Sequence, residues 1–172
     1  MKLKGKRVAL FVANFYEDLE FWYPYYRLKE EGAEVVIIGP GIDSYAGKHG
    51  LPVKSDKAIS EVDPKKFDGL IIPGGYSPDH MRRSPKMVEF VKAMHADGKP
   101  IAAICHAGWM LASAGIVRGK KLTSFYSIKD DMINAGAEWV DSEVVRTGNL
   151  ITSRMPSDLP AFCLAIITAL GG

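Results

Sequence analysis

Cys105 directly follows a short apolar run, residues 101–104, and is followed at once by His106. The run has the length of one buried strand, and the small residues Ala107 and Gly108 suit a tight turn into a helix. Such a turn projects a nucleophile from the carboxyl end of a sheet. The N–H groups and positive dipole end of the helix would favour the thiolate. The sequence therefore predicts a reactive cysteine, and the alternative is a small buried hydrophobe.

Two successive glycines, Gly74 and Gly75, follow the apolar run 68–72 and Pro73. If this run is the neighbouring strand, the glycines lie at the same sheet edge as Cys105, because parallel strands end their carboxyl termini together. Backbone N–H groups there, with that of His106, have the composition of an oxyanion hole. The plainer interpretation is a tight turn.

Three carboxylates, Glu17, Asp18 and Glu20, follow the first apolar run and open a predicted helix. Acidic residues in a first helical turn cap N–H groups and complement the helix dipole. One of them could instead point at Cys105 and exchange a proton with it, with a pKa raised by burial. Composition alone leaves both interpretations open.

The other cysteine, the other histidines and one glycine-containing segment give no indication of a functional site. Cys163 falls on an apolar helix face, where a cysteine is usually part of the core. His49, His80 and His95 are scattered without ligand spacing, so we expect no metal site. Residues 39–41 lack the later glycine of a dinucleotide fingerprint, and we expect no cofactor.

Short apolar runs alternate with amphipathic stretches, which predicts an α/β fold with a mostly parallel sheet covered by helices on both faces. The predicted strands are residues 7–13, 34–39, 68–72 and 101–104, with shorter strands at 139–145 and 150–153. The predicted helices are residues 17–31, 85–97, 106–114, 127–135 and a last helix from Pro156 or Ser157 to Leu170.

Single residues indicate where some of these helices bend or begin. Pro24 predicts a kink or a restart in the first helix, because proline removes a helical hydrogen bond. Ser84 is the expected cap of the second predicted helix, and Ser157 or Asp158 that of the last. Residues 41–56 suit a small hairpin excursion. No linker divides the chain, so residues 1–172 are expected to form one domain.

Net charge and hydropathy exclude several classes of protein. A net charge of +2 over 172 residues is too small to indicate nucleic acid or an anionic membrane as a partner. No apolar run reaches the roughly 18 residues of a membrane span, and the first run is too short for a signal peptide. We therefore expect a cytoplasmic protein in which both cysteines are free thiols.

Several motifs together resemble those of the PfpI/ThiJ family in the class I glutamine amidotransferase-like superfamily. They are most similar to the PfpI intracellular protease branch and to related bacterial stress proteins. The motifs lie at residues 13–18, 47–50, 73–75, 103–106, 119–124, 128–136, 139–145 and 152–159. The resemblance implies a flavodoxin-like three-layer sandwich that assembles as a homodimer or hexamer.

The resemblance also implies roles for single residues. Cys105 matches the nucleophile, and Glu17 matches the carboxylate that hydrogen-bonds it. His106 matches a histidine that an acid of a neighbouring subunit orients, and Asp79 stands at the position of that acid. Gly74 or Gly75, with the N–H of His106, would form the oxyanion hole.

This sequence departs from the family pattern at two places. It reads Ala107-Gly108 after the nucleophile pair, where relatives commonly carry Gly-Pro. Phe125 stands where some relatives outside the protease branch have a histidine. Chemistry that depends on that histidine is therefore not expected here.

Three functions follow from these residues. The first is a cysteine hydrolase, a PfpI-type peptidase or amidase with Cys105 as nucleophile. The second is a cofactor-independent glyoxalase or deglycase, in which Cys105 adds to methylglyoxal or its adducts and Glu17 moves protons. The third is a redox-sensing stress protein or chaperone in which Cys105 is oxidised reversibly. The hydrolase ranks narrowly first, and the expected substrate is a peptide or a small aldehyde.

Overall fold

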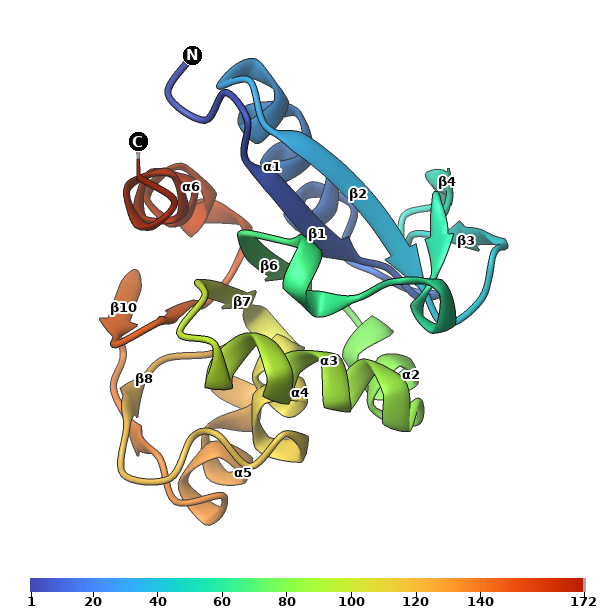
Figure 1. Ribbon diagram of the computed structural model, residues 1–172. Coiled ribbons are helices and arrows are strands. Elements are labelled where there is room, and N and C mark those ends of the chain that lie inside the picture. Colours follow the sequence, from blue (N-terminus) through green and yellow to red (C-terminus); the bar gives the residue numbers. More distant parts are fainter. Residues whose placement is uncertain (172) are drawn as a thin grey trace.

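The computed structural model describes residues 1–171, in which seven strands form one central sheet (Figure 1). The strands are β1 (Arg7–Phe11), β2 (Glu34–Gly39), β5 (Lys57–Ala58), β6 (Gly69–Ile72), β7 (Ile101–Ile104), β10 (Val144–Thr147) and β11 (Leu150–Ser153). They are ordered β10-β11-β7-β6-β1-β2-β5. All neighbours pair in parallel except β10, which runs antiparallel to β11.

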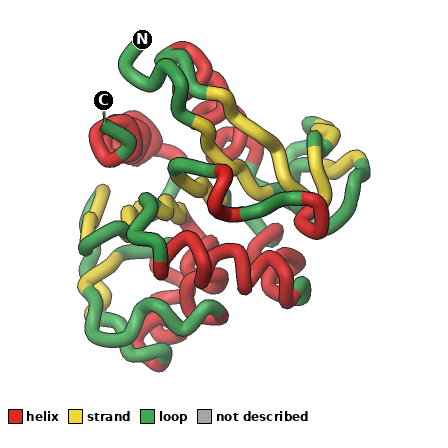
Figure 2. The backbone as a smooth tube through the Cα atoms, viewed as in Figure 1, coloured by secondary structure: helices red, strands yellow, loops and turns green. Residues whose placement is uncertain are grey.

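Helices cover both faces of this sheet (Figures 1 and 2). One face carries α1 (Asp18–Glu30) and α6 (Leu159–Ala169), which pack against each other. The other carries α3 (Pro85–Ala96) and α4 (Gly108–Ser113), flanked by α2 (Ser77–Arg82) and α5 (Lys129–Asn134). The predicted flavodoxin-like three-layer arrangement is confirmed.

Alternating side chains of the strands divide the core into two apolar layers. In β1, Ala9 and Phe11 join the layer under α3 and α4, whereas Val8 and Leu10 join the layer under α1 and α6. Side chains point to opposite faces at successive strand positions, and here both faces are buried. This explains why the strands read as continuous apolar runs. Burial of these layers holds the carboxyl ends of β1, β6 and β7 in fixed register.

The predicted hairpin is present as β3 (Ser44–Ala46) paired antiparallel with β4 (Pro52–Lys54). A separate two-stranded parallel sheet pairs β8 (Lys121–Leu122) with β9 (Glu138–Trp139). Neither β8 nor α2 was expected, because two-residue strands and single helical turns carry no periodic signal. No helix among residues 1–171 has the length and apolarity needed to cross a membrane.

Two helices differ in part from what their sequences predict. Helix α1 continues through Pro24 without a restart, and the proline ring is buried with the helix's apolar side. Asp158 stands at the N-cap of α6 as expected, but its side chain makes no capping bond. Its carboxylate instead accepts hydrogen bonds from Arg154, a charged partner that outcompetes the helix N–H groups.

Candidate active site

Cys105 lies on a strained turn between β7 and α4. Its φ angle is 62°, in the left-handed region that non-glycine residues rarely adopt, and a single 3₁₀ turn (Cys105–Ala107) leads into the helix. The side chain is 7% exposed. Such backbone strain persists only where the surrounding structure enforces it and is common at reactive centres. The predicted strand-to-helix elbow is therefore present, with its helix starting later than expected.

Gly74 and Gly75 pack directly against this elbow. A Cβ on Gly74 would lie 2.6 Å from the Cβ of Cys105, and one on Gly75 would lie 2.3 Å from the carbonyl oxygen of Phe15. Both positions therefore need glycine. Phe15 itself has a φ of 61°, so this loop and the elbow are both strained where they meet.

The two glycine N–H groups have different partners. The N–H of Gly74 donates to Oε2 of Glu20 at 2.8 Å, so it is not free to form an oxyanion hole. The N–H groups of Gly75 and His106 are directed toward the sulfur of Cys105 and act to lower the pKa of the thiol. The candidate oxyanion hole thus consists of Gly75 and His106, without Gly74.

Glu20 is the carboxyl that lies against Cys105. It is fully buried at the start of α1, and its Oε1 atom has no hydrogen-bond partner among residues 1–171. Burial, and next the charge of Glu17, raise the pKa of Glu20 to about 8. The side chain is consequently a carboxylic acid at neutral pH, able to donate its proton.

The pKa of the Cys105 thiol is raised, first by burial and then by the charge of Glu20. The backbone N–H groups lower the pKa of the thiol, in the predicted direction, but burial and Glu20 outweigh them and the pKa is raised overall. Because Glu20 holds a proton at neutral pH, its repulsion of a thiolate is then absent. The two groups behave as one coupled pair whose proton can move between them.

Glu17 lines the same cavity but has other partners. Its Oε2 accepts a hydrogen bond from the N–H of Glu20 at 3.0 Å, which caps α1. Its Oε1 lies 3.5 Å from Nε2 of His49. The expectation that Glu17 hydrogen-bonds Cys105 was therefore wrong, and Glu20 is the carboxyl that lies against the thiol. Glu20 could have been found as the carboxyl on the buried stripe that continues through Pro24 and Leu28.

His106 lies beside the nucleophile and has no acidic hydrogen-bond partner among residues 1–171. Its Nδ1 is 3.2 Å from Sγ of Cys105, and its Nε2 is 3.1 Å from Oγ of Ser127. The ring stacks on Phe125 with centroids 5.2 Å apart. Burial, and then the charge of Lys48, lower the pKa of His106, so the imidazole is neutral. Sequence reasoning missed both Ser127 and Lys48.

Asp79 does not reach His106 within the chain. It forms an ion pair with Arg83, which lies one helical turn later and directly follows α2. Its expected role across a subunit interface stays a prediction.

These groups open into one cavity of about 570 Å³ at the carboxyl ends of the strands. Its walls combine aromatic rings with the charged side chains of Glu17 and Lys48. The lining residues are Phe15, Glu17, Glu20, Lys48, Gly75, Tyr76, Cys105, His106, Trp109, Phe125 and Pro156. No group of three His, Cys, Asp or Glu side chains suited to hold a metal ion occurs in residues 1–171.

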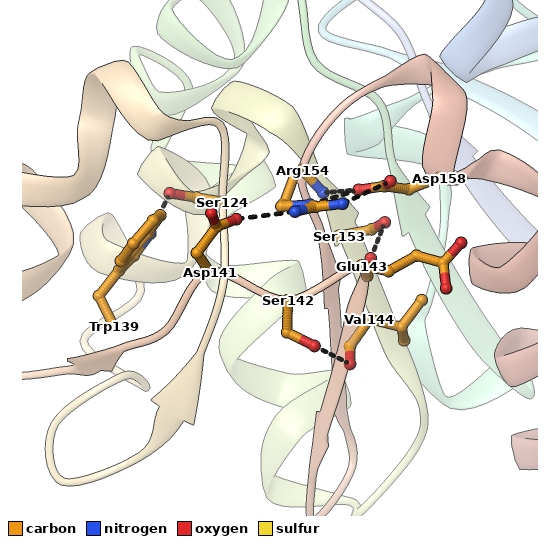
Figure 3. A network of polar contacts seen from close by, with 9 residues as sticks. All are labelled: Ser124, Trp139, Asp141, Ser142, Glu143, Val144, Ser153, Arg154 and Asp158. Atoms are coloured by element: carbon orange, nitrogen blue, oxygen red, sulfur yellow. Dashed lines mark hydrogen bonds and ion pairs between the residues drawn. The ribbon is translucent and has the colours of Figure 1, made fainter.

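Figure 3 shows the charged network around Arg154, an arginine clamp next to Pro156 of the cavity wall. Arg154 lies between two carboxylates, bonding Asp158 at 2.9 and 3.0 Å and Asp141 at 2.7 Å. Both carboxylates raise the pKa of Arg154, so the clamp stays charged. It fixes the turn between β11 and α6, because Arg154 and Asp158 flank Pro156.

Comparisons with known proteins show the family and the fold. The sequence profile described as the DJ-1/PfpI family matches residues 6–169. A protein of Pyrococcus horikoshii named as a deglycase is 50% identical over 156 residues, covering 91% of this chain and 94% of the relative. A protein of Escherichia coli named protein/nucleic acid deglycase 2 is 42% identical over 170 residues, covering 97% and 99%.

Two solved structures share the fold. Drosophila melanogaster DJ-1beta matches with a TM-score of 0.91 and 32% identity over 97% of this chain and 91% of its own. A two-domain protein of Anabaena variabilis, with DJ-1/ThiJ/PfpI-like and ferritin-like domains, matches with a TM-score of 0.95 and 43% identity. That match covers 96% of this chain and 48% of the other, so this chain spans about half the length of that protein.

Proposed function

The chain belongs to the DJ-1/PfpI family, and we propose that it is a Cys105-dependent glyoxalase or deglycase acting on methylglyoxal or its amine adducts. The observation that carries this proposal is Glu20, a carboxyl with a pKa of about 8 buried beside the thiol. Moving a proton between two adjacent carbons needs one group that both gives and takes protons near neutral pH. The deglycase names of the relatives support the same reaction class.

The first step is addition of the sulfur to the aldehyde carbon, C1. The pair enters this step after one of its two protons has been released to solvent and the other is on Glu20. The thiolate adds to C1 while Glu20 gives its proton to the aldehyde oxygen, so that a hemithioacetal forms and Glu20 is left as the carboxylate. The N–H groups of Gly75 and His106 stabilise negative charge on the sulfur before attack. Neutral His106, at 3.2 Å from the sulfur, orients it.

The second step is an internal oxidation and reduction. Glu20 takes the C1 hydrogen as a proton, the electron pair of that bond forms a C1–C2 double bond, and the π pair of the C2 carbonyl moves onto its oxygen. Glu20 returns the proton to C2 while the hydroxyl proton moves from the C1 oxygen to the C2 oxygen. C1 is thereby oxidised to a thioester and C2 is reduced to an alcohol. Water then releases lactate and regenerates the thiol, so no external oxidant is required.

Peptide or amide hydrolysis is the second candidate. The elbow and the N–H groups of Gly75 and His106 favour it, because they suit acyl transfer. It would also need an acid to orient His106, and Asp79 of a second copy in a homodimer or hexamer is our candidate for that acid. We rank it second because the partner of His106 in this chain is the neutral Ser127.

One experiment distinguishes the glyoxalase or deglycase from the hydrolase. Purified wild-type protein and the Cys105→Ala variant are incubated with methylglyoxal, and lactate is measured, while fluorogenic peptides are offered to the same preparations. The proposal expects lactate from the wild type alone and negligible peptide cleavage. Peptide cleavage that depends on Cys105, without lactate, would overturn it in favour of the hydrolase.

A further inference from the structure

A loop at the tip of the β3–β4 hairpin is fixed over the cavity by a buried carboxylate. Asp18, 4% exposed, accepts hydrogen bonds from the N–H groups of His49 at 2.9 Å and Leu51 at 3.1 Å. The Tyr16 hydroxyl donates to the carbonyl of Leu51, and the N–H of Lys48 donates to the carbonyl of Tyr16 at 2.9 Å. The loop is therefore held from both sides, and its tip has a defined position.

Gly47 allows this loop to approach so closely. A Cβ at this position would lie 2.3 Å from Oδ1 of Asp18, a distance that side chains do not tolerate. The geometry thus places the next residue, Lys48, at the wall of the cavity that contains Cys105.

The ammonium group of Lys48 is an unpaired cation at this wall. Among residues 1–171 its Nζ atom has no ion pair or hydrogen bond, unlike several other lysines of the chain. Glu17 does not neutralise it, because both Glu17 oxygens face other groups. Lys48 is near enough to lower the pKa values of Glu20 and His106.

The cavity also has more room than methylglyoxal needs. Its volume of about 570 Å³ lies within the roughly 300–1,000 Å³ typical of pockets for drug-sized ligands. A substrate that fills it carries a substituent beyond the reacting carbons. A cation on the cavity wall, exposed and without a partner among residues 1–171, favours an anionic substituent on the substrate.

We propose that Lys48 binds an oxyanion, a carboxylate or phosphate, on the substrate, so that the site prefers anionic 2-oxoaldehydes or their adducts. This inference rests on the proposed function for the reaction, but anion binding at Cys105 can be measured without turnover. The amide of Lys48 is held by Tyr16, so its side chain is presented from a fixed backbone.

The test compares two alkylating reagents that differ in charge. Iodoacetate and iodoacetamide react with the same sulfur, and their rate ratio at Cys105 cancels changes in the thiol's own reactivity. We expect Lys48→Ala to lower the iodoacetate-to-iodoacetamide ratio about tenfold, and Lys48→Arg to restore most of it. Lys54→Ala, which removes a lysine of the same hairpin outside the cavity, is the control and leaves the ratio unchanged.

Protection experiments identify the oxyanion. Inorganic phosphate or acetate is added during alkylation by iodoacetamide, and slowing by either anion that is lost in Lys48→Ala supports the proposal. The anion that protects at lower concentration shows which oxyanion the site prefers. An unchanged reagent ratio in Lys48→Ala, or protection that persists in it, overturns the proposal. Because no step measures lactate, this failure is distinct from failure of the glyoxalase reaction.

Discussion

Glu20 and Cys105 flank the same point in the structure, since a Cβ built on Gly74 would lie 2.5 Å from Oε2 of Glu20 and 3.1 Å from Sγ of Cys105. The Gly74 N–H holds Oε2 at 2.8 Å, which leaves Oε1 of this buried carboxyl without a partner among residues 1–171. An unpartnered buried oxygen is costly and is retained where it serves function. The free Oε1 can carry the proton that this carboxyl holds at neutral pH.

Replacing this carboxyl should remove the reaction while leaving the nucleophile in place. Glu20→Gln keeps an acceptor for the Gly74 N–H but cannot take a proton from carbon, so we expect lactate formation to fall at least about 100-fold. Alkylation of Cys105 by iodoacetamide should continue, which shows that the thiol is present and accessible. The matched control is Glu17→Gln, which retains the N-cap acceptor and should lose less than about tenfold.

The same substitution should change how stability depends on pH. Glu20 has a folded-state pKa of about 8 against a usual value of 4.5. Between these values the unfolded chain releases the proton that the folded protein keeps, so stability falls as pH rises and the loss is complete above about pH 8. Glu20→Gln lacks this loss, so its stability relative to the wild type should rise by a few kcal/mol between about pH 5 and pH 9. Urea unfolding at both pH values measures this, and a constant difference would contradict the assignment.

Ser127 should act through His106. Its hydroxyl, 3.1 Å from Nε2, selects which ring nitrogen carries the proton and thereby whether Nδ1 donates to the sulfur or accepts from it. We expect Ser127→Ala to lower kcat about fivefold and to shift the pH profile of Cys105 alkylation. Ser127→Thr, which keeps the hydroxyl, should restore both properties. A normal pH profile in Ser127→Ala would show that the contact is only structural.

Gly75, which packs against the elbow at Cys105, should not tolerate a side chain. Gly75 and Gly98 both have positive φ angles, 71° and 68°, but only Gly75 has backbone atoms where a Cβ would go. Gly98→Ala should cost about 1 kcal/mol, from the left-handed conformation alone. Gly75→Ala adds a steric clash beside the active site and should cost about 3 kcal/mol or more. Urea unfolding of both variants provides the comparison, and equal losses would show that the clash is relieved by small shifts.

The fold was predictable because buried parallel strands read as apolar runs and their connecting helices as amphipathic stretches. Residues 34–39 and 101–104 were identified with their observed bounds, and Ser84 caps α3 as expected. Short elements such as α2 and β8 were missed, because they are defined by tertiary contacts and not by periodicity.

The site was predictable where it depends on local sequence. The elbow at Cys105 follows from one strand, one nucleophile and two small residues. Which carboxyl faces Cys105 depends on how α1 is rotated about its axis against the sheet. The sequence does not give this rotation, so it could not show that Glu20, and not Glu17, lies against the thiol. Ser127 and Lys48 lie in segments separated in sequence from Cys105. Only the folded structure shows that Ser127 contacts His106 and that Lys48 lines the cavity.

The central claim is that Cys105 and Glu20 together move a proton between the two carbons of a 2-oxoaldehyde. The most direct measurement is the amount and chirality of lactate formed from methylglyoxal by the wild type, Cys105→Ala and Glu20→Gln. Buffer-catalysed conversion gives racemic lactate, whereas proton delivery by one fixed carboxyl gives a single enantiomer. We predict one enantiomer from the wild type and only the racemic background from both variants. A single enantiomer still formed by either variant, or racemic lactate from the wild type, would contradict the claim.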